Sequence, residues 1–441
     1  MIFKVINDMM KKVFFYMLFF SAPFFSKAQS LLTLQDAINI SLKNSLDIQL
    51  AKNTVQSNTI LNNIGVAGGL PLVTGDISDN ESVSNINQKL SSGTTTLKNG
   101  SATNALSAGV TGSILLYNGY RVVATKHRLE ELQKQSQYQL NSRIQNVIAE
   151  VMTAYYDVVR QQSYTKTIDQ SIDISQQKLK IVKVSQSVGL ANNADLFQAQ
   201  IDLNALLQSK QSQLLVIDQA KTELLRLLTL KADSAIAIRD TIVVDQAVNL
   251  GEVLESLNKN ADILAADRQI KINEYIVKET AAQRYPSIRG IAGLNFSRNQ
   301  AGAGQVLLNQ NFGPTIGVSI GIPIYNGGVY RRQEQVAKID VQNADISKRI
   351  LQRDYSAQVV KSYQSYVSSL QQLAVERNNY DTATKLVDVV LKRFQQRVAT
   401  IVDLKNAQQS FEESGYRLVN LSFAAKSAEI ELKRLANRLS L

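Results

Sequence analysis

The sequence predicts a mainly helical fold with membrane-type β-strands, built from two tandem structural repeats. Three observations predict it. The motif Tyr117-Asn118-Gly119 returns as Tyr325-Asn326-Gly327, an offset of 325 − 117 = 208 residues that also relates Asp195 to Asp403. Long stretches free of Pro and Gly carry apolar residues at alternating spacings of three and four. Between the helical stretches, apolar residues alternate with small or polar ones, as in β-strands.

Residues 1–28 are predicted to be a secretory signal peptide. Three lysines precede the apolar run from Val13 to Phe20, and Ser26-Lys27-Ala28 has the pattern of a cleavage site. Without this segment the chain carries 44 basic and 36 acidic residues, a formal charge of +8. Because the charges are scattered and the chain is exported, we expect no nucleic-acid partner.

Composition excludes several classes of chemistry. The 441 residues include no Cys and one His, His127, so the chain alone cannot form disulfides, a thiol nucleophile, a His-based triad or a multi-His metal site. No phosphate-binding loop or nucleophile elbow is present. We therefore expect no enzyme, no cofactor and no metal.

Each repeat is expected to begin with a helix, from Thr33 to about Leu61 and from Leu250 to Arg284. Thr33 precedes Asp36, and Asn249 precedes Glu252, by three residues, which is the pattern of a helix N-cap.

Strands are expected at about 70–117 and 286–324, with hairpin loops at 91–101 and 299–311. Each strand should be about ten residues long with one apolar face, which suits a membrane barrel around a wet lumen. A half-buried strand of a soluble sandwich is the alternative. The first copy has seven extra residues between Pro71 and Tyr117, which we interpret as a longer surface loop.

Long coiled-coil helices are predicted at 121–187 and 329–397, with return helices at 195–230 and 403–439. The first of them spans roughly 100 Å at 1.5 Å per residue. The repeats then occupy 29–230 and 249–441, joined by a linker at 231–248.

Four strands in one chain cannot close a membrane barrel, which needs about eight or more. The barrel must therefore be shared between chains. Two chains give eight strands and a lumen plugged by side chains, whereas three give twelve strands and room for a pore.

From Leu34 to Leu439 the chain resembles the TolC-like outer membrane efflux protein family. The resemblance rests on segments at 32–37 and 284–288, the two Tyr-Asn-Gly corners, and the helix tips Val188-Gly189-Leu190-Ala191 and Thr400-Ile401-Val402-Asp403-Leu404.

The resemblance implies a homotrimeric channel-tunnel: a shared twelve-stranded barrel in outer membrane lipid, continued by a helical tube across the periplasm. It implies a passive exit duct for drugs or other small molecules, coupled to a periplasmic adaptor and an inner-membrane RND, ABC or MFS transporter. Type I protein secretion is the alternative within the family. A secreted coiled-coil structural or adhesive protein is the alternative of another class.

The resemblance also implies that the tips dock the adaptor. Val188, Gly189 and Leu190 match the family's Val-Gly-Leu/Thr motif. At the second tip, Arg397 replaces Gly and is followed by Val398, Ala399 and Thr400, so we expect a different local geometry or partner contact there. Ala399 stands where the family has an entrance-locking Arg. The alternative for Gly189 is a simple helix C-cap.

By the same resemblance, Asp403 matches one aspartate ring of a periplasmic constriction, and Asn406 occupies the second ring position. Three converging Asp403 side chains would raise one another's pKa and attract cations. The alternative for Asp403, and for its counterpart Asp195, is a first-turn carboxylate stabilised by the helix dipole.

Overall fold

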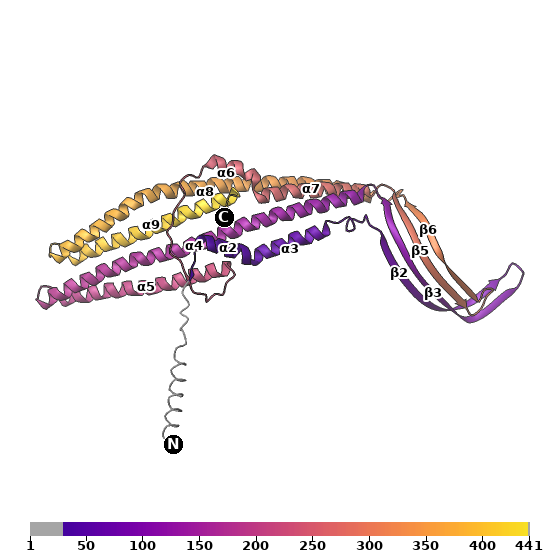
Figure 1. Cartoon of the computed structure of the whole chain (residues 1–441), viewed down its shortest axis with the longest axis horizontal. Coiled ribbons are helices and arrows are strands. Elements are labelled where there is room, and N and C mark those ends of the chain that lie inside the picture. The colour runs from indigo at the N-terminus through magenta and orange to yellow at the C-terminus, as the bar shows by residue number, and fades with distance from the viewer. Residues whose placement is uncertain (1–29, 440–441) are drawn as a thin grey trace, which may run out of the picture. The chain divides into compact units, whose positions relative to one another are not determined.

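A computed structural model describes residues 30–439, so the predicted signal peptide lies outside the described residues. Figure 1 shows long antiparallel helices and one extended sheet. The first repeat contains α2 (Leu34–Asn44), α3 (Leu46–Leu61), β2 (Leu72–Lys89), β3 (Thr95–Tyr117), α4 (Arg121–Ser187) and α5 (Asn193–Leu227). The second contains α6 (Leu250–Ser256), a 3-10 turn (Leu257–Lys259), α7 (Ala261–Ala282), β5 (Ser287–Ala301), β6 (Leu308–Gly321), α8 (Val329–Gln395) and α9 (Ile401–Leu435). In the connecting segment, β4 (Ile236–Ala237) pairs in parallel with β1 (Ser30–Leu31).

The first helix of each repeat begins with the predicted cap but is interrupted. Thr33 Oγ1 accepts a hydrogen bond from the Asp36 N–H at 3.1 Å, and Asn249 Oδ1 accepts one from the Gly251 N–H at 2.8 Å. The continuous helices that we expected are wrong, because Ser45 and Asn260 cap new helices within them. Their side chains accept bonds from the backbone N–H groups of Ile48 and Asp262, which competes with helix continuation.

The four long strands form one antiparallel sheet in the order β2-β3-β5-β6. They have 18, 23, 15 and 14 residues, so the expected length of about ten is wrong. The loops are correspondingly shorter than predicted. The extra residues of the first repeat extend the β2–β3 hairpin: β3 pairs with β5 only as far as Thr103, while its pairing with β2 continues to Thr95.

The register separates an apolar face of the sheet from a polar one, because directly paired residues of neighbouring strands point to the same side. One face carries the rows Val73–Gly112–Ala292–Ile316 and Ile77–Ala108–Phe296–Phe312. The other face carries Thr74–Thr111–Gly293–Thr315 and Ser78–Ser107–Ser297–Asn311. Ile77 and Ile316 are 81% and 91% exposed, so nothing in the described chain covers the apolar face over them. No helix within residues 30–439 is both long and apolar enough to cross a lipid bilayer.

The chain divides into two compact units that do not follow the repeats. Of the described residues, one unit contains 30–41, 151–243 and 375–423, and the other contains 42–150, 244–374 and 424–439. Each unit therefore combines parts of both repeats. In the first, helices α4, α5, α8 and α9 surround Leu179, Val182, Leu404 and Phe411; in the second, Val359 and Tyr366 of α8 pack against Leu432.

The repeat is also visible in the backbone angles. Residues with positive φ occur in four pairs at the 208-residue offset: Gly119 and Gly327, Tyr120 and Gly328, Gly189 and Arg397, Thr229 and Asn437. The two copies thus share the same corners and helix ends even where the side chains differ.

Candidate functional site at the helix tips

The first tip joins α4 to α5 through a helix C-cap in which Gly189 has φ 76°. The Gly189 N–H donates to Gln186 O at 3.0 Å, and the Leu190 N–H donates to Ser185 O at 2.8 Å. These two bonds form a Schellman motif, which requires a left-handed residue at the position of Gly189. Val188 and Leu190 are largely exposed on either side of it.

The second tip has the same backbone, although Arg397 replaces glycine. Arg397 has φ 63°, its N–H donates to Phe394 O at 3.1 Å, and the Val398 N–H donates to Arg393 O at 2.8 Å. The different local geometry that we expected from Arg397 is therefore wrong. The capping bonds determine the turn, and the arginine adopts left-handed angles at a cost of about 1–2 kcal/mol.

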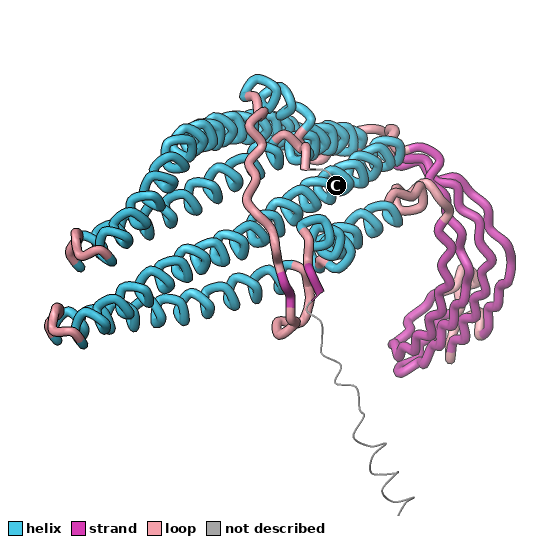
Figure 2. The backbone as a smooth tube through the Cα atoms, turned by 60° about the vertical axis from the view of Figure 1, so that its left-hand side comes forward, coloured by secondary structure: helices cyan, strands magenta, loops and turns pink. Residues whose placement is uncertain are grey.

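The two tips line one cavity of about 320 Å³. Leu190 and Asp195 of the first repeat lie there with Arg397, Ala399 and Thr400 of the second. Figures 1 and 2 show both turns at the same end of the helices. The structure thus brings half of the predicted site residues to one surface, while Val188, Gly189, Val398, Asp403 and Asn406 lie outside the cavity lining and are exposed.

Asp403 and Asp195 both lie in the first turn of a helix. The Asp403 carboxylate accepts from the Thr400 N–H at 2.9 Å and from its hydroxyl at 2.8 Å, and the Asp403 N–H donates to Thr400 Oγ1. The Asp195 N–H donates to Asn192 Oδ1 at 2.8 Å. Both aspartates are therefore first-turn residues of their helices, which is the position that the helix-dipole alternative requires.

The capping bonds from Thr400 lower the pKa of Asp403 below its usual value. This is the direction opposite to the one expected for three converging carboxylates. The convergence of three Asp403 side chains stays a prediction. Asn406 lies one turn further along α9, exposed to solvent.

The sequence did not predict a buried ion pair between α4 and α5, near the tips. Lys178 Nζ lies 2.7 Å from the Asp202 carboxylate and its side chain is 1% exposed, while Lys405 Nζ lies 3.6 Å from the same carboxylate. Burial raises the pKa of Asp202, but the hydrogen bonds from Lys178 and Gln198 outweigh it and lower that pKa. This cluster connects α4, α5 and α9.

The same residues line a cavity of about 340 Å³ together with Glu412. Burial raises the pKa of Glu412, although a hydrogen bond of 3.1 Å from the Gln408 amide opposes the shift. One signal in the sequence could have revealed the cluster: Lys178 lies four residues after Ile174, in line with the buried seam of α4.

The profile of the outer membrane efflux protein family matches residues 37–231 and 253–438, which is most of the chain. The chain belongs to this family. It is similar to outer membrane protein TolC of Vibrio cholerae, with 22% identity over 348 residues that cover 76% of this chain and 77% of the relative.

Two solved structures of outer membrane proteins show the same fold as this outer membrane efflux protein. VceC of Vibrio cholerae has 17% identity and a TM-score of 0.76, covering 92% of this chain and 96% of VceC. CmeC of Campylobacter jejuni has 14% identity and a TM-score of 0.77, covering 96% of this chain and 92% of CmeC. As an outer membrane efflux protein, the chain is located in the outer membrane and extends into the periplasm.

Proposed function

We propose that three copies of this chain form a passive exit duct for drugs or other small molecules. In this proposal a twelve-stranded barrel crosses the outer membrane and the helices form a tube in the periplasm. A periplasmic adaptor docks at the tips, and an inner-membrane RND, ABC or MFS transporter supplies the energy. The duct itself carries out no bond chemistry and uses no cofactor.

The observation that carries this proposal is the open sheet. Strands β2 and β6 are its two edges, and each presents unpaired backbone groups over most of its length. In lipid such edges are strongly unfavourable, and four strands are too few to close on themselves. Three chains supply twelve strands, with the apolar face toward lipid and the polar face toward a lumen wide enough for solutes.

Exposed apolar residues along the helices support the same assembly. Val336, Ile339, Ile346 and Ile350 lie on α8 at spacings of three, seven and four, and each is 46% to 57% exposed. Phe197 and Ile201 of α5 are exposed in the same way. A heptad-like seam without a partner is typical of a helix that packs against a neighbouring subunit.

For the tips we propose docking of the adaptor's helical hairpin at Val188, Gly189 and Leu190, together with Arg397, Val398, Ala399 and Thr400. Both turns share one backbone geometry, so a hairpin could dock at each, but Arg397 adds a positive charge to the second. The exposed apolar side chains of Val188, Leu190 and Val398 support a protein contact there.

We propose the constriction at Asp403, Asn406 and Asp195. Replacing Asp403 with alanine is expected to change single-channel conductance and weaken block by divalent cations, because it removes three negative charges from the narrowest ring. Unchanged conductance and block would place Asp403 away from the constriction.

Reconstitution tests the proposed duct. The mature protein, extracted from membranes with detergent, is expected to run as a heat-sensitive trimer and to open discrete conductance steps in planar lipid bilayers. Extraction without detergent, with no conductance, would instead favour the secreted coiled-coil protein. Mixing with the candidate adaptor and cross-linking through cysteines placed at residues 188 and 398 tests docking at each tip separately.

A further inference from the structure

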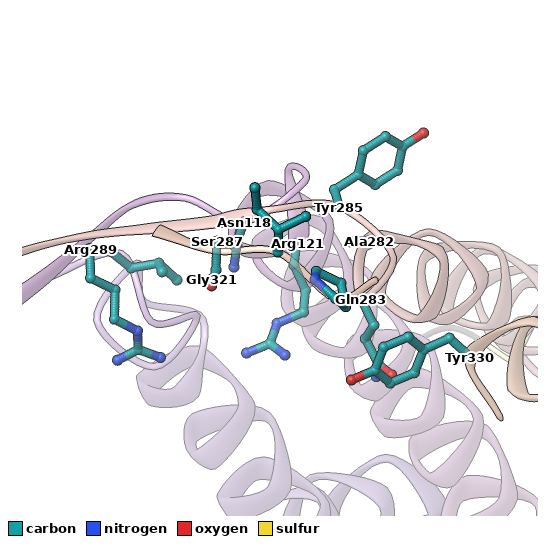
Figure 3. A pocket seen from close by; sticks show the side chains of 12 residues that line it. Asn118, Arg121, Ala282, Gln283, Tyr285, Ser287, Arg289, Gly321 and Tyr330 are labelled. Atoms are coloured by element: carbon teal, nitrogen blue, oxygen red, sulfur yellow. The ribbon is translucent and has the colours of Figure 1, made fainter. Parts of the chain in front are cut away.

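A cavity of about 470 Å³ lies where the strands of the sheet join the helices (Figure 3). It is lined by the ends of β3, α7 and β6 and by the beginnings of α4, β5 and α8. Its polar lining residues include Asn118, Arg121, Gln283, Ser287, Arg289 and Tyr330.

The lining carries positive charge without any negative charge. Of its twelve residues two are arginines and none is acidic. Within residues 30–439 neither Arg121 nor Arg289 forms an ion pair, whereas the nearby Arg284 and Arg128 are bound to Glu334 and Glu279 at 2.5 Å and 2.6 Å. The two guanidinium groups of the cavity therefore keep their full capacity to bind an anion, and a guanidinium stays charged at every relevant pH.

Asn118 adds an unused donor. Its side-chain oxygen accepts from the Val122 N–H at 3.4 Å at the start of α4. Its Nδ2 is buried and has no hydrogen-bond partner among the described residues. A buried donor of this kind is normally paired, so a ligand or a water that accepts from it is expected in the cavity.

The register places the arginine of β5 on the polar face of the sheet. Arg289 pairs with Ser319 and Leu115, four residues before the Gly293 of the threonine row. Figure 3 shows the guanidinium groups of Arg289 and Arg121 on one side of the strands and the ring of Tyr285 on the other. Because the polar face lines the lumen in the proposed duct, the cavity opens to the lumen at the base of the barrel, once per chain.

We infer that this cavity is an oxyanion-binding subsite of the channel lumen. It binds the phosphate, sulfonate or carboxylate group of an anionic solute through Arg121 and Arg289, with Asn118 as a further donor. This inference rests on the proposed duct, and it adds a class of solute: negatively charged small molecules. Planar guanidinium groups suit such oxyanions because they donate two parallel hydrogen bonds.

Two measurements on the purified full chain test the subsite. The first is the reversal potential across neutral phosphatidylcholine bilayers in a KCl gradient, with block by pyrophosphate. The second is calorimetric binding of pyrophosphate to the protein in detergent, which does not depend on channel activity. Replacing both Arg121 and Arg289 with Gln is expected to shift permeability toward potassium and to weaken pyrophosphate binding by about tenfold for each arginine.

The matched control is Arg298→Gln, which removes an arginine from the same strand but from the opposite face, and which is expected to change neither readout. Absent conductance with intact, arginine-dependent binding would refute the duct and leave the subsite standing. Normal conductance with unchanged selectivity and binding in the double variant would overturn the subsite. Effects that appear only in bilayers containing phosphatidylglycerol would assign the arginines to lipid headgroups and would also overturn it.

Discussion

The two tips have the same backbone conformation but different side chains at the left-handed position. The comparison shows that helix capping determines the backbone angles, while the residue type determines the charge on the exposed surface. Gly189 and Arg397 occupy equivalent left-handed positions closed by equivalent hydrogen bonds. Only Gly189 adopts these angles without steric cost. Arg397 adopts the same angles at a steric cost and adds a positive charge to the exposed surface of the second tip.

The same comparison applies deeper in the helices. Lys178 and Asp202 form a buried pair in the first repeat, while the positions 208 residues later hold Leu386 and Ser410. A second close contact occurs only in the second repeat: Gly415 of α9 is closely packed, while its counterpart Leu207 on α5 is 46% exposed. The two repeats thus share the same backbone fold but differ in the side-chain contacts that stabilise it.

The largest expected effect comes from breaking the buried pair. Asp202→Ala leaves Lys178 buried without its principal counter-charge and should lower the local free energy of unfolding by about 3 kcal/mol. Hydrogen exchange of α4 and α5, followed by mass spectrometry, measures this loss. The matched control Ser410→Ala at the equivalent position should change it by less than about 0.5 kcal/mol. Equal effects at both positions would refute the distinction between the repeats.

Next is the close contact at Gly415. A Cβ at this position would lie 2.8 Å from Thr167 Cγ2 and 3.3 Å from Tyr380 Cε2. Gly415→Leu should therefore destabilise the helices by about 2 kcal/mol. The mirror change Leu207→Gly should cost only about 1 kcal/mol, mainly through helix propensity. Thermal unfolding of both variants by circular dichroism tests the order, and a larger loss for Leu207→Gly would contradict the packing described.

Substitutions at the two tips should change stability by a smaller amount, and in opposite directions. Gly189→Ala should destabilise the first tip by about 1 kcal/mol, whereas Arg397→Gly should stabilise the second by up to about 1 kcal/mol. Hydrogen exchange at residues 185–190 and 393–398 reports each turn separately. Destabilisation of the second tip by Arg397→Gly would show that the arginine holds the turn through its side chain.

The smallest expected effect is a pH-dependent change in stability at Glu412. Because burial raises the pKa of Glu412, its contribution to stability is fully present below its usual pKa of 4.5 and is lost as the pH rises through the raised value. Asp202 behaves oppositely: its lowered pKa makes a contribution that is present above about pH 4 and is lost in acid. Glu412→Gln should therefore raise the melting temperature at pH 7 by about 1–2 °C and have no effect near pH 4. A benefit that persists unchanged at pH 4 would contradict this assignment.

Periodicity and repeat spacing predicted the fold well, since the long helices and the alternating strands each depend on a pattern that continues over many residues. The interruptions of the first helices were not predicted. Ser45 and Asn260 are residue types that favour helix N-caps, but they lie within long helical patterns, and their capping role became evident only from the hydrogen bonds that their side chains accept. Arg397 was misjudged because residue type was taken to set the turn, whereas the capping bonds do. The Lys178–Asp202 pair joins residues on two helices, and only their packing brings the charges together.

Cross-linking of the sheet edges tests most directly whether the barrel is shared. Because the chain contains no Cys, pairs of cysteines can be introduced without background, one at Thr74 in β2 and one at successive positions along β6. Mild oxidation in intact outer membranes is expected to produce covalent trimers at a narrow set of β6 positions, and no trimer when either cysteine is absent. Disulfides formed only within single chains, with the protein remaining monomeric, would contradict a sheet completed by neighbouring subunits.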